Sequence, residues 1–455
     1  MTEQVQEKKL QARNMMLNMG PSHPAMHGIV RLVLELDGEK VVNAEVEIGY
    51  LHRAFEKMSE QGGYLQVIPY TDRLNYVSPL INNVGYCLAV EKLFGIEVPE
   101  RTNYIRVILS EISRVTDHLT CIGASAMELG AFTAFLYMIK AREYLYELIE
   151  SVTGARITVS YVRVGGVKGD LPEDFEEKTL PAIRETRKVL KECDQLLTRN
   201  RIFLDRMKEV GMISKEDALA YGITGPFLRS TGVDYDVRRA SPYLVYDRFD
   251  FEIPVGRHGD NMDRYLCRME EMEQSLRIVE QALKQIPKGP LSVDREGKVI
   301  PAAEAVDEAK MGRVEGLAEV RVALDPTLEG AHRDQYPALE SPEKRAVLPA
   351  KEDTYGNIEG LMNHFKMMMM GGGFGMGAHG IRPPKGEVYF PVEGGNGELG
   401  FYVVSDGTDR PYRVRVRPPC FPIMAALPLC LRGYTVADIV PTFGSVNMIG
   451  GELDR

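Results

Sequence analysis

Five segments of this chain have the apolar periodicity of α-helices, and they constrain the fold more than any other feature. They cover residues 78–94, 102–122, 130–152, 170–205 and 260–285. Gly95 and Gly154 follow two of them, as glycine commonly follows a helix. Residues 130–152 are apolar and aromatic on much of their surface, so this helix must be buried among others. The sequence therefore predicts a central helical bundle.

Alternating apolar and polar residues predict β-structure near both ends of the chain. Residues 29–36 and 41–48 alternate on either side of Asp37-Gly38, which is a strong hairpin signal. Similar alternation follows near the C-terminus, at residues 387–390, 398–404 and 412–416. We therefore expect an α+β fold with antiparallel β regions flanking the bundle. The expected parts are an N-terminal α+β region (1–76), the helical core (77–289), an inserted surface segment (290–356) and a C-terminal α+β region (357–455).

A glycine-rich stretch at residues 375–380 has the letters G-x-G-x-x-G. It follows a methionine-rich segment, predicted to be helical over residues 357–370, and it lacks the strand that a dinucleotide-binding fingerprint requires. We interpret it as a flexible linker. The inserted segment before it has one β-like run, at residues 319–324.

Composition excludes several classes of protein. The net charge of −10 argues against a general nucleic-acid or anionic-lipid surface. No apolar run reaches the roughly 18 residues of a membrane span, and the N-terminus has no secretory signal. The six cysteines form no C-x-x-C pair, so we expect buried, reduced thiols and no metal or cluster on this chain.

The loop GPSHPAMHG at residues 20–28 presents two imidazoles, His23 and His27, in a segment that cannot be helical. Pro21 and Pro24 each remove a backbone donor and favour extended geometry before them. Such a loop can present a ring nitrogen to a cavity, or it can be a turn with two incidental histidines.

A second candidate segment, residues 72–76, places an acid, a cation and a phenol close together in an irregular region. Reduction of a quinone requires donors that also release protons, and Tyr and His are suited to this near neutral pH. Tyr76 and His27 are therefore candidate proton donors, although a capped loop with a surface Arg73 accounts for the same residues. His118 and Glu128 flank a run of small residues and could orient another histidine, or simply cap their helices.

The chain resembles the 49-kDa (D) subunit family of respiratory NADH–quinone oxidoreductases, complex I. The resemblance lies in GPSHPAMHG (20–28), IGYLHRAF (48–55), YTDRLNY (70–76), LAVEKL (88–93), RVILSEISR (106–114), YVRVGGVK (161–168), GVDYDVR (232–238), RPPKGEVY (382–389), GELGFYVVSDG (397–407) and GELDR (451–455). This family is similar to the large subunit of nickel–iron hydrogenases, which implies a hydrogenase-like helical core. Because the N-terminal loop has histidines in place of thiols and the last eight residues contain no cysteine, we expect no nickel.

The resemblance also implies roles for individual residues. His27 and Tyr76 would contact the quinone head group and deliver protons, and we add His23 as a further cofactor-binding candidate. Glu128 stands where the family usually has an aspartate that orients the histidine, and His118 matches a family histidine. Arg73 would approach an iron–sulfur cluster carried by a partner subunit.

One departure concerns residues 157–160, where many members have a histidine whose protonation is tied to reduction of that cluster. This chain has Thr158 there. We expect a lower and less pH-dependent cluster potential, which suits menaquinone better than ubiquinone.

The resemblance implies the quinone-site subunit of a proton-pumping NADH–quinone oxidoreductase. It would be peripheral, on the cytoplasmic side of the bacterial inner membrane. Its partners would be chiefly the B, C, I and H subunits, with no nucleic acid. Alternatives are the catalytic subunit of a hydrogenase, a structural scaffold with a closed cavity, and a related complex that takes electrons from ferredoxin or a deazaflavin.

Overall fold

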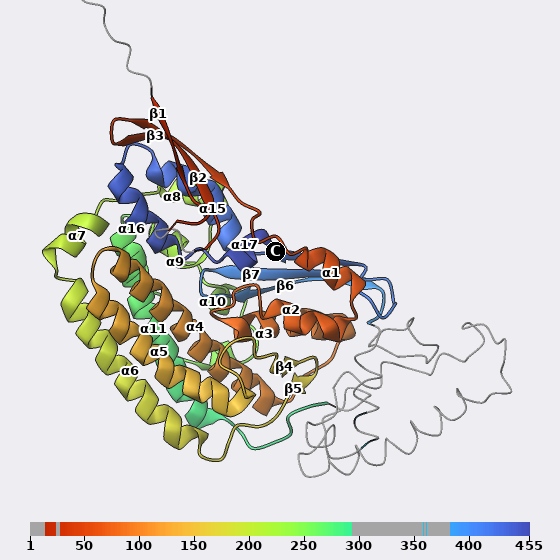
Figure 1. Ribbon diagram of the computed structural model, residues 1–455. Coiled ribbons are helices and arrows are strands. Elements are labelled where there is room, and N and C mark those ends of the chain that lie inside the picture. The colour runs from red at the N-terminus through yellow and green to blue at the C-terminus, as the bar shows by residue number, and fades with distance from the viewer. Residues whose placement is uncertain (1–13, 24–27, 294–357, 359–360, 362–382) are drawn as a thin grey trace, which may run out of the picture.

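The helical bundle forms the centre of the molecule (Figure 1). The structure is a computed structural model that describes residues 14–23, 28–293, 358, 361 and 383–455. The long helices are α3 (Pro79–Phe94), α4 (Glu100–Glu128), α5 (Phe132–Thr153), α6 (Phe175–Leu197) and α11 (Asn261–Gln285). Helix α4 packs against α3, α5 and α11, so it is the centre of the bundle.

The ends of these helices follow the capping signals in the sequence. Gly95 and Gly154 adopt left-handed φ values of 68° and 82° after α3 and α5, which glycine tolerates without strain. Asp260 caps α11 by accepting a hydrogen bond from the Asp263 backbone over 2.8 Å. The segment 170–205, predicted as one helix, forms two helices, α6 and α7 (Arg201–Met207). The helical run is interrupted at Asn200, which caps α7.

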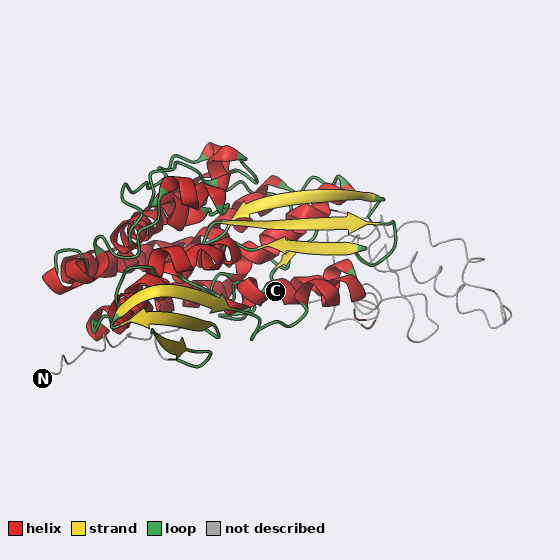
Figure 2. Cartoon of the chain, turned by 90° about the horizontal axis from the view of Figure 1, so that it is seen from above, coloured by secondary structure: helices red, strands yellow, loops and turns green. Residues whose placement is uncertain are grey.

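Two three-stranded antiparallel sheets flank the bundle, as expected for an α+β fold (Figure 2). The N-terminal sheet is β1 (Met15–Met19), β2 (Arg31–Asp37) and β3 (Lys40–Glu47), and the C-terminal sheet is β6 (Gly386–Glu393), β7 (Glu398–Ser405) and β8 (Arg413–Arg417). The predicted hairpin about Asp37-Gly38 is confirmed, whereas β1 was not predicted. A short pair, β4 (Val162–Arg163) and β5 (Gly166–Val167), lies apart from both sheets.

Three C-terminal helices were missed, because the prediction for this region named only strands after residue 370. They are α15 (Cys420–Leu431), α16 (Val436–Val446) and α17 (Gly450–Asp454). Pro428 and Pro441 lie inside the first two, and proline normally argues against a helix interior. Burial of their apolar side chains, in α15 against β3 and in α16 against α4 and α15, outweighs that penalty.

Short helices complete the described chain and connect the larger elements. They are α1 (Phe55–Gln61), η1 (Tyr64–Val67), α2 (Ile68–Thr71), α8 (Lys215–Ala220), α9 (Gly225–Arg229), α10 (Val237–Ala240) and η2 (Tyr246–Arg248).

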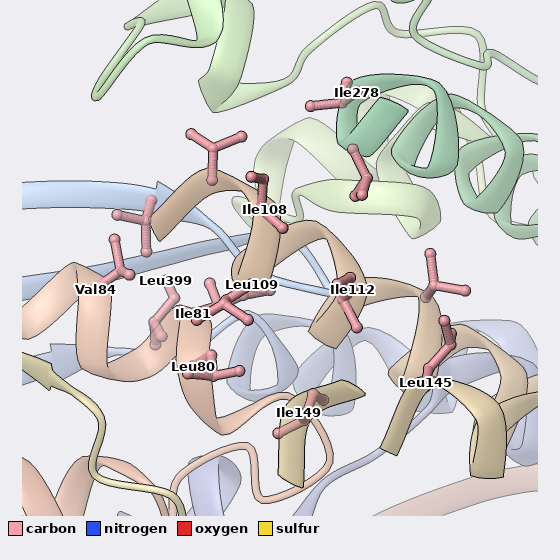
Figure 3. Close-up of a cluster of buried hydrophobic side chains, with 14 of the residues drawn as sticks. Leu80, Ile81, Val84, Ile108, Leu109, Ile112, Leu145, Ile149, Ile278 and Leu399 are labelled. Atoms are coloured by element: carbon pink, nitrogen blue, oxygen red, sulfur yellow. The ribbon is translucent and has the colours of Figure 1, made fainter. Parts of the chain in front are cut away.

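Two hydrophobic cores hold these layers together. The larger joins α3, α4, α5 and α11 to β7, where Ile81, Ile112 and Leu399 are all at most 1% exposed (Figure 3). The smaller joins β1–β3 to α15 and α16. Each buried aliphatic side chain contributes about 1.5–3 kcal/mol, so these cores fix the loops that the helices carry.

Several predictions fall outside the described residues. These are the β-run at 319–324, nearly all of the helix at 357–370, the glycine-rich stretch at 375–380, and most of the inserted segment. Within the described part of the chain, no helix combines the length and the apolarity needed to cross a membrane.

Candidate functional site

The C-terminal tail, residues 447–455, is buried and brings together two loops that are distant in sequence. A Cβ built on Gly451 would lie 2.3 Å from the Arg73 carbonyl oxygen and 2.5 Å from that of Leu74. A Cβ built on Gly28 would lie 2.8 Å from Met448 Cε. The tail therefore packs directly on the loop before Tyr76 and on the end of the histidine loop. Figure 1 shows the C-terminus beside α1 and α17, between the N-terminal and C-terminal sheets.

Tyr76 lies at the edge of this junction, with 38% of its surface exposed. Partial burial, and then the nearby charge of Asp117, raise the pKa of its hydroxyl, whereas the Arg53 guanidinium acts in the opposite direction. The phenol is therefore neutral and able to donate a proton to a ligand in front of it. Packed apolar side chains do not wall it off, since more than a third of the residue faces outward.

Asp117, fully buried in α4, ties the Tyr76 loop to the tail. Its Oδ2 accepts hydrogen bonds from Asn75 Nδ2 (2.8 Å) and Ser78 Oγ (2.9 Å), and its Oδ1 accepts one from Asn447 Nδ2 (3.0 Å). Asn447 in turn donates to Asn396 Oδ1 over 2.7 Å. We call these five residues the Asp117 network. It fixes the backbone on both sides of Tyr76.

Glu452 and Cys420 extend this network into the interior. The Cys420 thiol donates to Glu452 Oε1, and Asn396 Nδ2 donates to the same oxygen over 3.3 Å. Glu452 is 1% exposed, and burial raises the pKa of its carboxyl to about 7. A carboxyl group that changes protonation state near neutral pH therefore lies beside the candidate site.

Arg73 lies on the exposed side of the same loop, held by a hydrogen bond to the Pro69 carbonyl. Asp72, beside it, is buried and accepts a hydrogen bond from the Ser160 backbone over 3.0 Å. This contact brings residues 157–160 next to Arg73, and Thr158 is exposed there with a φ of 55°. The structure thus places together the two positions that we associated with a partner's cluster.

The other candidates near the N-terminal loop are only partly placed. His27 lies outside the described residues, and His23 is exposed. Glu128 lies against α16, where a Cβ built on Gly444 would be 3.1 Å from Glu128 Oε2. Eleven residues separate Glu128 from Asp117, which is about 16 Å along a helix. Among the described residues, Tyr76 therefore lies near Asp117. The pairing of Tyr76 with His27 stays a prediction.

His118 belongs to a second buried group, which we call the arginine cluster. Its Nε2 lies 3.3 Å from Glu271 Oε2, and both side chains are fully buried. The remaining members are charged: Glu111, Arg114, Arg229, Asp236, Arg238 and Glu393. Helix α4 supplies Glu111, Arg114 and His118 at the spacing of one helical face.

Four carboxylates face three guanidinium groups in this cluster, so apart from His118 it has one negative charge in excess. Burial, and then the charge of Asp236, raise the pKa of Glu393 to about 7, so Glu393 can hold a proton that reduces this excess. Asp236, Glu271 and Glu393 come within 4.8 Å of one another, as metal ligands would. Arg229 already pairs with all three, at 3.3, 3.0 and 2.8 Å, so the donor set fits an ion-pair cluster better than a metal.

A hollow of about 410 Å³ is lined in part by the last three residues of the tail, Leu453, Asp454 and Arg455. Its lining includes Glu56, Lys57, Arg413 and Arg415, and it does not include Tyr76. Arg415 pairs with Glu56 at 3.2 Å, and Lys57 and Arg413 both pair with Glu60, which also lines the hollow. Ile48, Phe421 and Leu453 also line the hollow, so its walls are apolar as well as charged.

The six cysteines are all buried and unpaired, as the sequence predicted. Sequence reasoning nevertheless missed the roles of Asp117, Asn396, Cys420 and Glu452. The charged face of α4, spaced at positions 111, 114 and 118 in an otherwise apolar helix, was a usable signal for the arginine cluster. The contacts of Glu452 had no such signal, because they join residues that are 32 or more positions apart.

Comparison with known proteins identifies the class. Residues 128–455 match the family described as the respiratory-chain NADH dehydrogenase 49 Kd subunit. The chain belongs to this family, which confirms the resemblance seen in the sequence. It is therefore a subunit of an oxidoreductase complex.

Individual relatives agree with this assignment over nearly the whole chain. The D 1 subunit of the NADH-quinone oxidoreductase of Sorangium cellulosum is 50% identical over 450 residues, 99% of this chain and 97% of that protein. The D subunit of the Myxococcus xanthus enzyme is 48% identical over 446 residues, 98% of this chain and 94% of that protein. The C/D subunit of the Bdellovibrio bacteriovorus enzyme is 46% identical over 439 residues, 96% of this chain and 68% of its own length.

Proposed function

We propose that this chain forms the quinone site of a proton-translocating NADH–quinone oxidoreductase, and that Tyr76 donates a proton to the quinone head group. The observation that carries the proposal is the position of Tyr76. Its phenol is part-exposed and neutral, and Asp117 fixes the chain on its N-terminal side through Asn75. Quinone oxygens are acceptors only, so a fixed, neutral donor is the group that they require.

The electrons come from an iron–sulfur cluster in a partner subunit that covers the surface at Arg73 and Thr158. Both side chains are exposed, and the contact between Asp72 and Ser160 joins the two segments that carry them. A guanidinium at that surface stabilises the extra electron on a reduced cluster. The absence of an ionisable side chain at position 158 favours a low-potential acceptor such as menaquinone.

The other residue assignments follow from the family. His27 would be the second proton donor, His23 a neighbour in its loop, and Glu128 the carboxyl that orients His27. The fully buried His118 would act at a distance, through Glu271. The C subunit is a partner, because the Bdellovibrio relative carries the name of both C and D. The B, I and H subunits complete a peripheral arm on the cytoplasmic side of the membrane.

Replacement of Tyr76 by Phe tests the proposal. The ring and its packing remain, whereas the hydroxyl that donates the proton is lost. In the assembled complex, we expect NADH:quinone activity to fall by about 10²–10⁴-fold, while NADH oxidation by an artificial acceptor such as ferricyanide is unchanged. The half-buried Tyr402, which donates a hydrogen bond to Glu387 on the C-terminal sheet, is a matched control for loss of a phenol. Quinone turnover that survives in Tyr76→Phe as in Tyr402→Phe contradicts the assigned role.

A further inference from the structure

Glu452 is a buried carboxyl with neutral hydrogen-bond donors, and the proposed reaction does not yet use it. Its Oε1 accepts from the Cys420 thiol and from the Asn396 amide. Buried carboxylates in proteins are normally paired with a cation, as Glu91 is with Arg106 at 2.6 Å in this chain. Neutral donors stabilise an ionised carboxylate less than a guanidinium does, so the proton-bound form of Glu452 is stable up to neutral pH.

The surroundings of Glu452 connect it to Tyr76. The charged and titratable groups that act on it are Cys420 from α15 and Asp117 from α4, and its own charge acts on Tyr76. The Arg53 guanidinium lies beside the neighbouring Gly451 and also acts on Tyr76. Asn396 and Asn447 join Glu452 to Asp117 through hydrogen bonds, and Asp117 holds Asn75, the residue before Tyr76. Gly451, the neighbour of Glu452, touches the backbone of residues 73 and 74.

We propose that Glu452 is a proton-binding residue that controls when Tyr76 gives up its proton: neutral Glu452 permits a phenolate at Tyr76, and ionised Glu452 opposes one. This inference rests on the proposed function. In that reaction the Tyr76 O–H bond breaks as its proton passes to a quinone oxygen that has received electrons from the partner's cluster. The phenolate then regains a proton from water. Because Asp117 is already a negative charge nearby, a second one at Glu452 disfavours the phenolate further.

Glu452 acts through its charge on Tyr76 and does not touch the quinone. This role predicts that quinone reduction slows as the pH rises. Burial raises the pKa of Glu452 to about 7, so the neutral form prevails below that pH and the ionised form above it. Ionised Glu452 raises the pKa of Tyr76 further, after burial, Asp117 and Cys420, and so makes its phenolate less accessible. In the intact complex, we expect quinone reduction to fall severalfold between pH 6.5 and 8.5, after division by the ferricyanide rate of the same preparation.

The test compares Glu452→Gln with wild type across this pH range. The glutamine Oε1 keeps both hydrogen bonds and cannot ionise. We expect the variant to retain its quinone rate at pH 6.5 within about twofold and to lose most of the alkaline decline. Glu452→Asp, which still ionises, should keep the decline. Glu387→Gln, which removes an exposed carboxylate beside Tyr402, should behave as wild type.

Cys420→Ser gives a second test, in which the alkaline decline should shift instead of disappearing. It tests the inference even if the Glu452→Gln complex does not assemble. A hydroxyl is a stronger donor than a thiol and stabilises the ionised carboxylate, so the midpoint of the decline should move to lower pH. A pH profile of Glu452→Gln that matches wild type, or an unmoved midpoint in Cys420→Ser, overturns the inference. Such a result leaves the proposed function intact if Tyr76→Phe still abolishes quinone reduction.

Discussion

Asn75 donates a hydrogen bond from Nδ2 to Asp117 Oδ2 over 2.8 Å, and through it the buried centre of helix α4 fixes the residue before Tyr76. The same carboxylate accepts from Ser78 and Asn447, so one side chain joins the Tyr76 loop, helix α3 and the tail. The candidate site therefore depends on a single buried acceptor that lies behind it.

Asp117→Asn should damage both the fold and the reaction. The new amide nitrogen would face donors, and each unsatisfied buried donor costs about 1–3 kcal/mol. We expect the free energy of unfolding in urea to fall by about that amount, and the quinone rate to fall while the ferricyanide rate is retained. The exposed Asp247 provides the matched control, since Asp247→Asn should change stability by less than about 0.5 kcal/mol.

Glu393 should make the stability of the fold depend on pH. Because the pKa of Glu393 in the folded chain, about 7, lies above the ordinary value of 4.5, its contribution to stability is fully present below about pH 4.5 and is lost as pH rises through 7. The loss is on the order of 3 kcal/mol. Urea unfolding at pH 5 and pH 8 should show a smaller difference for Glu393→Gln than for wild type. An equal difference in both would show that Glu393 is not the titrating group.

Gly85 in α3 should not tolerate a side chain. A Cβ there would lie 2.8 Å from Val392 Cγ2 and 2.9 Å from Phe401 Cε2, in the tight contact between α3 and the C-terminal sheet. Overpacking of this kind costs about 1–3 kcal/mol, so Gly85→Ala should lower the melting temperature. Gly386→Ala, where nothing lies within 4 Å, should leave it nearly unchanged. Equal melting temperatures for the two variants would mean that α3 packs less tightly than described.

Thr158→His should restore an ionisable group beside Arg73. A β-branched residue is strained at a φ of 55°, and histidine occupies this region more readily, so the loop should accept the change. In the assembled complex, we expect redox titration of the nearest cluster, followed by electron paramagnetic resonance, to give a higher potential that depends on pH. Thr158→Asn, which cannot ionise, serves as the control. A pH-independent potential in Thr158→His would place the cluster elsewhere.

The sequence predicted those parts of the fold that local patterns encode. Helices α3 and α5 end at their predicted glycines, and the hairpin turns at Asp37-Gly38. Helices α15 and α16 escaped prediction, because their internal prolines are tolerated only where tertiary burial compensates for the lost hydrogen bonds.

The site was predicted in a similarly partial way. Tyr76 and Arg73 were predicted as candidates because an acid, a cation and a phenol lie close together in one short segment of the sequence. Glu452 could not be predicted from the sequence, since its pKa depends on burial and on Cys420, 32 residues earlier. Long-range contacts of this kind leave no periodic trace in a single sequence.

Photolabelling of the assembled complex with a photoreactive quinone analogue tests most directly whether the quinone head group binds at Tyr76. We expect the label on residues 70–78 or on the tail at 447–453, reduced by excess quinone and by Tyr76→Phe. Label found instead on Lys57, Arg413 or Arg415 in the neighbouring hollow, or on no residue of this chain, would contradict the account.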